Sequence, residues 1–130
     1  MGAAENVELV RRGYTAFNAG DMAGLSGVFA EDAVWYVAGS GALSGVKQGR
    51  DEILAYFGEL AARTQGSFQA KLEDVVGGEN HTVAIQQTQG KNNTKTLDMA
   101  TVITFVVRDG KITEGREFFE DTAKADDFWT

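Results

Sequence analysis

Cysteine and proline are both absent from the 130-residue sequence, and histidine occurs once. Without cysteine, the chain forms no disulfide and no thiolate metal site. With a single histidine, a zinc or iron site of the usual kind would need carboxylates for nearly all of its ligands. We therefore expect no metal and no cofactor.

Basic residues are also few. Lys and Arg total 12 against 19 Asp and Glu, which leaves a formal net charge of -7, and the basic residues are scattered along the chain. Such a protein repels phosphate backbones and anionic lipids, so we expect neither a nucleic-acid partner nor a membrane surface. Apolar runs are short and the N-terminus lacks the basic-then-apolar pattern of an export signal, so we expect a cytoplasmic protein.

The rest of the composition is that of an ordinary globular domain, with 43% apolar and 24% charged residues. A chain of this length buries roughly two-thirds of the surface that its unfolded form exposes, which is enough for a real core. No internal repeat, low-complexity tract or linker interrupts the sequence. We therefore expect one domain over residues 1–130.

The first half of the chain has the apolar spacing of amphipathic helices. One helix is predicted over 5–19 and ends at Gly20, and Asp21 can cap a short second helix. A third helix is predicted after Gly49, where two acidic residues suit the positive end of a helix dipole. The apolar positions of these three helices are, in order, Val7, Val10, Tyr14 and Phe17; Met22, Leu25, Val28 and Phe29; and Ile53, Leu54, Phe57, Leu60 and Ala61.

From Ser67 onward the apolar residues alternate with polar ones, which is typical of half-buried antiparallel strands. Polar or glycine-containing turns separate the segments. The predicted strands are 33–38 in the first half, then one that starts at Ser67 and ends at the turn 77–80, then 82–89, 95–108 and 111–121. Helices first and a long meander last predict an α+β fold, with the helices packed on one concave face of a curved, mainly antiparallel sheet.

Four segments resemble a known family. They are FNAGD at 17–21, VFAEDAVW at 28–35, GRDEI at 49–53 and VRDGKI at 107–112. In this order they resemble the SnoaL-like group of the nuclear transport factor two and ketosteroid isomerase superfamily. The resemblance implies a cone-shaped α+β barrel around a ligand cavity, usually as a homodimer. It does not specify a reaction, because this fold hosts several enzyme activities and noncatalytic modules.

The residues that match the steroid isomerase site are not catalytic types. The base aspartate of those enzymes lies five residues past an acid that matches Asp32, and here that position is Val37. Their oxyanion tyrosine matches Gly13, with Tyr14 next to it, and their second acid falls near Ile103. The resemblance therefore does not extend to steroid isomerase activity.

One carboxylate matches the cyclases of the SnoaL type. Those enzymes keep an aspartate five residues after the Ile of DGKI, and the position here is Glu117. Their accompanying glutamine and histidine match Thr101 and Ile103, so only the acid is retained. The resemblance therefore implies Glu117 as the candidate general base.

The turn at 108–111 decides which way Glu117 points. A two-residue Asp109-Gly110 loop pairs Val107 with Ile112 and sets Glu117 opposite Val102. A type I turn with Gly110 as a left-handed bulge pairs Val107 with Lys111 instead. We favour the bulge because it gathers more bulky apolar groups with Glu117. In that register the face of Glu117 carries Met99, Thr101, Ile103, Phe105, Val107 and Phe119.

Burial against such a face would raise the pKa of Glu117 into the range useful for a general base. The alternative is that Glu117 pairs with a neighbouring Arg or faces water. Trp35 and Tyr36 point to opposite sides of their strand, and we assign Trp35 to the pocket. The predicted ligand-binding residues are Tyr14, Phe17, Trp35, Phe57, Met99, Thr101, Ile103 and Phe119.

Several further residues are assigned mainly structural roles. His81 is expected in solvent beside a turn, and Asp121 is expected to anchor the chain end. Phe128 and Trp129 should pack over the barrel or a partner subunit, since exposed aromatic rings are costly. Gln86 and Thr88 lie on one face of their strand and Gln87 and Gln89 on the other; either pair supplies cavity hydrogen bonds or lies at a hydrated dimer face.

Three functions remain open at this point. The protein is an enzyme that uses Glu117 on a small, largely apolar molecule such as a polyketide, terpenoid or steroid-like compound, with isomerase, cyclase or hydrolase chemistry. Alternatively, it is a noncatalytic binding module with the same cavity, or a structural dimer with a filled core. A homodimer is expected through an apolar outer face. In the bulged register that face carries Val102, Val106, Ile112 and Phe118.

Overall fold

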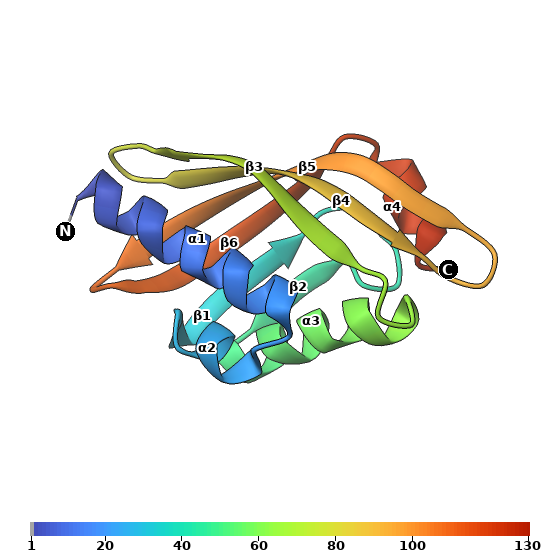
Figure 1. Cartoon of the computed structure of the whole chain (residues 1–130), viewed down its shortest axis with the longest axis horizontal. Helices are drawn as coiled ribbons and strands as arrows, with labels where there is room; N and C mark the ends of the chain where they lie inside the picture. Colours follow the sequence, from blue (N-terminus) through green and yellow to red (C-terminus); the bar gives the residue numbers. More distant parts are fainter. Residues whose placement is uncertain (1) are drawn as a thin grey trace.

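Six strands form one curved sheet in the order β2-β1-β6-β5-β4-β3. The computed structural model describes residues 2–130 (Figure 1). β1 and β6 run parallel, and all other neighbours are antiparallel. The elements are α1 (Ala3–Ala19), α2 (Met22–Ser26), β1 (Phe29–Val37), β2 (Gly45–Gln48), α3 (Arg50–Arg63), β3 (Gln69–Gly77), β4 (Thr82–Lys91), β5 (Thr96–Arg108), β6 (Lys111–Phe119) and α4 (Thr122–Phe128).

The helices lie against the concave side of the sheet. α1 packs on β3 and β4, and α3 packs on β1 and β2 (Figure 1). The sheet curves around them but does not close, since β2 and β3 are its two edges. The predicted α+β architecture, with the N-terminal helices on the concave face of a mainly antiparallel sheet, is therefore confirmed.

The junction between α1 and α2 follows its local sequence. Gly20 adopts the left-handed conformation that ends α1, with φ 71°, and the Asp21 side chain accepts a hydrogen bond from the Gly24 backbone. Asn18 then ties α1 to the sheet edge: its side chain donates to the Ala70 carbonyl and accepts from the Ala70 N–H. One amide thus satisfies both backbone groups of a residue on edge strand β3.

The β5–β6 turn corrects the predicted register. Asp109 and Gly110 form a two-residue loop, both with positive φ, and Val107 pairs with Ile112. The bulge predicted at Gly110 is therefore wrong. An irregularity instead follows Ile112, where Thr113 is the extra residue and its hydroxyl donates to the Val106 carbonyl.

This irregularity gives Glu117 the face that was predicted for it. Beyond Thr113 the pairing shifts by one residue, so Glu117 lies opposite Ile103 on the concave side. Ile112 precedes the shift, so it points inward and is only 2% exposed. The expectation that Ile112 contributes to the outer face is therefore wrong. Val102, Val106 and Phe118 stay on that face, and Phe118 is 50% exposed.

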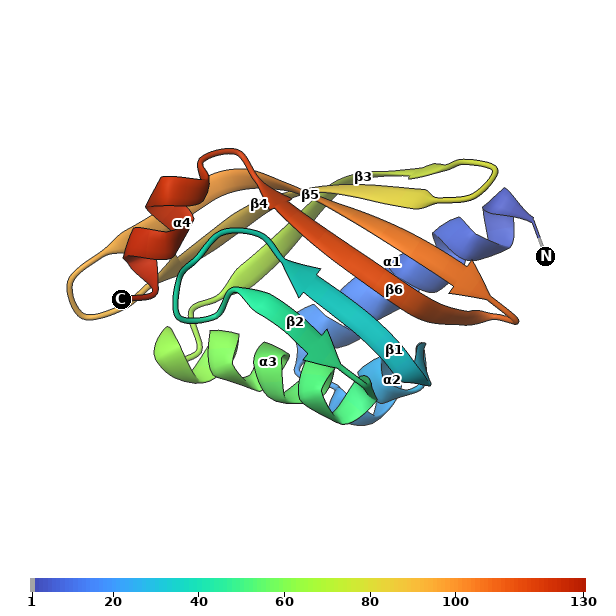
Figure 2. The ribbon, with the colours of Figure 1, turned by 180° about the vertical axis from the view of Figure 1, so that it is seen from behind.

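The sequence patterns missed the short strand β2 and the helix α4. The last strand ends at Phe119, not Asp121, and the Asp121 side chain caps α4 by accepting from the Lys124 N–H. α4 covers one end of the sheet (Figure 2), where Phe128 and Trp129 are buried and Trp129 packs near Phe68. None of the helices within residues 2–130 has the length and apolar character needed to cross a membrane.

Candidate functional site

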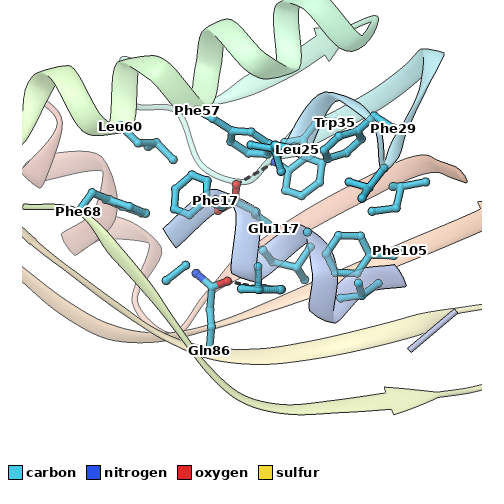
Figure 3. A pocket seen from close by; sticks show the side chains of 17 residues that line it. Phe17, Leu25, Phe29, Trp35, Phe57, Leu60, Phe68, Gln86, Phe105 and Glu117 are labelled. Carbon is cyan, nitrogen blue, oxygen red and sulfur yellow. Dashed lines mark hydrogen bonds between the residues drawn. The ribbon is translucent and has the colours of Figure 1, made fainter. Parts of the chain in front are cut away.

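A small cavity lies between α1, α3 and the concave face of the sheet. Its volume is about 60 Å³, and its walls come from α1, α2, α3 and every strand except β2. Seven of the lining side chains are aromatic (Figure 3). Gln86 and Glu117 are the only lining residues whose side chains are neither aliphatic nor aromatic. The cavity is therefore an apolar chamber with one carboxyl group in its wall.

Two phenylalanines separate this cavity from solvent. Phe17, near the end of α1, and Phe68, just before β3, are partly exposed, whereas every other lining residue is buried. Their rings pack edge to face with centroids 5.9 Å apart, and Phe17 also packs against Phe57 at 5.4 Å. The Phe17–Phe68 pair therefore forms the mouth of the cavity.

Glu117 is held in the wall by one of its two carboxyl oxygens. Oε1 accepts hydrogen bonds from the Trp35 indole N–H at 2.8 Å and from the Tyr56 hydroxyl at 2.7 Å. Oε2 accepts no hydrogen bond from any residue in 2–130, and it retains some accessible surface. Glu117 lines the cavity (Figure 3), and Oε2 is its carboxyl oxygen that accepts no hydrogen bond from the described residues.

Burial raises the pKa of Glu117 above its ordinary value, because the charged form loses its hydration. The hydrogen bonds from Trp35 and Tyr56 oppose this effect, as does the positive charge of Lys47. The proposed pairing of Glu117 with a neighbouring Arg is not seen. Arg116 points to the outer face, where it pairs with Glu114 at 3.1 Å and lies over the Tyr36 ring.

Lys47 is the cation whose charge acts on Glu117, although it does not line the cavity. Its ammonium group donates to the Leu43 and Ser44 carbonyls and lies 5.3 Å from the centroid of the Tyr56 ring. Burial lowers the pKa of Lys47, and the negative charge of Glu117 partly offsets that shift. None of the ion pairs found within residues 2–130 includes Glu117.

A polar chain runs along the opposite wall. The Tyr14 hydroxyl donates to Gln86 Oε1, Gln86 Nε2 donates to the Thr88 hydroxyl at 2.8 Å, and Thr88 and Thr101 share a hydrogen bond of 2.7 Å. Burial and, to a smaller extent, the charge of Glu117 raise the pKa of Tyr14, so its hydroxyl keeps its proton. Two pairs were candidates for cavity hydrogen bonds, Gln86 with Thr88 and Gln87 with Gln89. Gln86 and Thr88 are the pair that faces inward.

The structure brings most of the predicted site residues together. Met99, Thr101 and Phe119 do not line the cavity, and the Thr101 hydroxyl shares a hydrogen bond with Thr88. Tyr36 faces the opposite side of β1 from Trp35, as predicted. The predicted residues that line the cavity are Tyr14, Phe17, Trp35, Phe57, Ile103 and Glu117.

Tyr56 was not predicted, although its position carried a signal. It follows Ile53 by three residues and precedes Leu60 by four, so it lies on the apolar face of α3. A tyrosine on a buried helix face needs a partner for its hydroxyl. Only the fold shows that this partner is Glu117, 61 residues away in the chain.

Metal ligands do not gather at this site. Within the described part of the chain, residues 2–130, no group of three or more His, Cys, Asp or Glu side chains is placed to hold a metal ion. The cavity itself supplies a single carboxyl group. The described residues therefore place one carboxyl group in apolar surroundings.

Two more distant proteins with this fold have been solved with small molecules. TerC co-crystallized with polyporic acid has 20% identity and a TM-score of 0.83, covering 95% of this chain and 97% of that one. A protein from Catenulispora acidiphila in complex with trimethylamine has 15% identity and a TM-score of 0.76, covering 92% and 91%. At these identities the likeness shows the fold alone.

Closer relatives match nearly the whole chain. An uncharacterized protein of Mycobacterium tuberculosis is 36% identical over 125 residues, 95% of each chain. Bal32a, from a soil-derived mobile gene cassette, is 37% identical with a TM-score of 0.96, covering 98% of each chain. The SnoaL-like domain matches residues 10–115. With its fold, its cavity and these relatives, the chain belongs to the SnoaL-like domain family.

Proposed function

We propose that this protein is an enzyme acting on a small, compact, largely apolar molecule, with Glu117 as general base. The observation that carries the proposal is the asymmetry of the Glu117 carboxyl group. Trp35 and Tyr56 hold one oxygen, whereas the other accepts no hydrogen bond from residues 2–130, and the residue lines an apolar chamber. A positioned carboxylate with a raised pKa is suited to take a proton from carbon or from water.

The proton-transfer step uses the carboxyl oxygen that the protein leaves unbonded. Oε2 accepts the proton, and the electron pair of the broken C–H or O–H bond stays on the substrate or on water. The apolar walls favour the neutral acid that results, because a buried carboxyl group is less costly without its charge. Trp35 and Tyr56 hold Oε1 in place during the step and restrict rotation of the carboxyl group.

The cavity volume restricts the size of the substrate. Its 60 Å³ is well below the ~150 Å³ of an engineered protein cavity that binds benzene. A molecule of only a few heavy atoms matches this scale better than a ring system does. A polyketide or steroid-sized compound would have to displace the rings of Phe17 and Phe68 at the mouth, so small compact substrates fit this site best.

A noncatalytic binding module is the second candidate. It is favoured by Val37 and Ile103, which stand where related enzymes keep acids, and by the single carboxyl group in the wall. Two proteins of this fold that have been solved with small molecules support ligand binding in general. The two candidates differ in one property, which is proton transfer at Glu117.

Hydrogen–deuterium exchange on small ketones separates these candidates. Acetone and butanone are incubated with the protein in D2O, and loss of their α-proton NMR signals is followed together with binding-induced shifts of the protein. We expect catalysed exchange with the wild type and none with Glu117→Gln. Glu114→Gln is the matched control, because Glu114 lies on the same strand but on the outer face. Binding without exchange in the wild type would instead identify a binding module.

We also propose that the protein forms a homodimer through the outer face of the sheet. Phe118 is 50% exposed there, beside the partly buried Val102 and Val106. An apolar surface of this kind favours association. Phe118→Glu should be monomeric in sedimentation at micromolar concentration, whereas Met22→Glu, at an exposed apolar position on α2 away from the sheet, should not change the oligomeric state. A monomeric wild type would contradict this proposal.

A further inference from the structure

We infer that the molecule bound in this cavity carries a positively charged nitrogen, as a small alkylammonium ion does. This inference rests on the proposed role of the cavity as a ligand site, and it names the class of that ligand. It does not require proton transfer. Its support comes from the hydrogen-bonding capacity, charge, aromatic content and volume of the cavity.

Among the polar atoms of the cavity wall, one hydrogen-bond acceptor has no donor within residues 2–130. The Trp35 N–H is used by Glu117, and the Tyr14 hydroxyl is used by Gln86. Gln86 Nε2 has one N–H engaged by Thr88 and one left over, on a neutral amide. Glu117 Oε2, when ionised, is the strongest remaining group, and it accepts hydrogen bonds only. A ligand that donates to Oε2 therefore complements this wall best.

The charge on Glu117 has no counter-ion within contact distance. None of the ion pairs among residues 2–130 includes it, and Lys47, whose charge acts on Glu117 from a distance, does not line the chamber. A buried carboxylate without a paired cation is costly, and a cation brought by the ligand removes that cost. Charge-assisted hydrogen bonds are also stronger than neutral ones.

The walls suit an organic cation more than a hydrated metal ion. Seven aromatic side chains line the chamber, and Trp35 packs edge to face against Phe57 with centroids 5.3 Å apart. Aromatic rings attract ammonium groups and also contact their alkyl substituents, which is how quaternary ammonium ligands are recognised. The net charge of -7 further favours the approach of a cation.

Ionisation of Glu117 makes this binding depend on pH. The other titratable groups packed around it are Tyr14 from α1, Tyr56 from α3 and Lys47 from β2, and both tyrosines keep their protons because burial raises the pKa of each. Burial also raises the pKa of Glu117. Affinity for a ligand that stays cationic over this pH range should therefore increase as the pH rises through the pKa of Glu117, whereas affinity for a neutral ligand of the same shape should not.

Isopropylammonium and isopropanol are the matched probes, since they differ mainly in charge and each has four heavy atoms. Both are titrated into the wild type, Glu117→Gln and the outer-face control Glu114→Gln, and dissociation constants are obtained from NMR chemical shifts. We expect the wild type and Glu114→Gln to bind the ammonium at least about tenfold more tightly than the alcohol. Glu117→Gln should lose this preference.

Equal affinity for the two probes, or a preference that persists in Glu117→Gln, would overturn the inference. A pH series on the wild type provides a test that does not depend on folding of the variant: the ammonium must bind more tightly at higher pH while the alcohol does not. The ketone exchange experiment distinguishes the two proposals. Ammonium preference without ketone exchange removes the enzyme proposal alone, and exchange without ammonium preference removes this inference alone.

Discussion

The indole ring of Trp35 occupies the space that a side chain on Gly115 would fill. The two residues pair across β1 and β6, and a Cβ at Gly115 would lie 2.3 Å from both Cε3 and Cζ3 of the indole. Gly115 is two residues before Glu117 on the same face of β6. The missing side chain therefore lets the Trp35 N–H reach Glu117 Oε1.

Gly115→Ala should displace Trp35 and lower the free energy of unfolding by about 1–3 kcal/mol, as overpacked cores do. Urea unfolding measures this cost, and the indole N–H signal of Trp35 in an NMR spectrum reports the change at Glu117. The cost should shrink in a Trp35→Leu background, where the clash is absent. Gly58→Ala in α3 is the control, because no atom lies within 4 Å of a Cβ there. An unchanged Trp35 signal would contradict this account.

Tyr56→Phe should raise the pKa of Glu117 further. The Tyr56 hydroxyl donates to Oε1 and stabilises the charged carboxylate, so its removal favours the protonated form. The titration of the Glu117 carboxyl carbon by NMR measures this shift directly and needs no substrate. Tyr36→Phe on the outer face should leave the titration unchanged. A lower or unaltered pKa in Tyr56→Phe would show that the hydrogen bond does not stabilise the charge.

Glu117→Gln should become more stable relative to the wild type as the pH rises. Because the pKa of Glu117 is raised in the folded state, the wild type loses stability between the ordinary glutamate value of 4.5 and the folded-state pKa. Each unit of difference corresponds to about 1.4 kcal/mol. Urea unfolding of both proteins over a pH series measures the effect. If the stability difference stayed constant with pH, Glu117 would titrate alike in the folded and unfolded states.

Substitutions at the two residues of the Asp109-Gly110 loop should affect the free energy of unfolding differently. Gly110→Ala should lower the free energy of unfolding by about 1 kcal/mol, because φ is 74° there. Asp109→Gly should cost nothing or stabilise, since Asp109 also has a positive φ, 52°. Thermal unfolding of both variants checks this. A destabilised Asp109→Gly would favour the type I turn with a bulge at Gly110.

Local patterns in the sequence determined helices α1, α2 and α3, most of the strands and the fold class. Apolar spacing located α1 and α3, and Gly20 and Asp21 ended one helix and began the next, because these features depend on neighbouring residues. The resemblance of four short segments to the SnoaL-like group and the spacing after Ile112 were sufficient to name Glu117 as the candidate general base. Strand β2 and helix α4 were not predicted from the sequence, because both are too short to show a clear apolar period.

Tertiary structure decided the geometry around Glu117. The extra residue Thr113 inverts the facing of every later position on β6, and nothing in the local alternation of that strand requires it. Trp35 and Tyr56 reach Glu117 across 82 and 61 residues of chain. Cavity volume and the choice of bonded oxygen depend on packing between α1, α3 and the sheet, and such long-range contacts leave no periodic signal in the sequence.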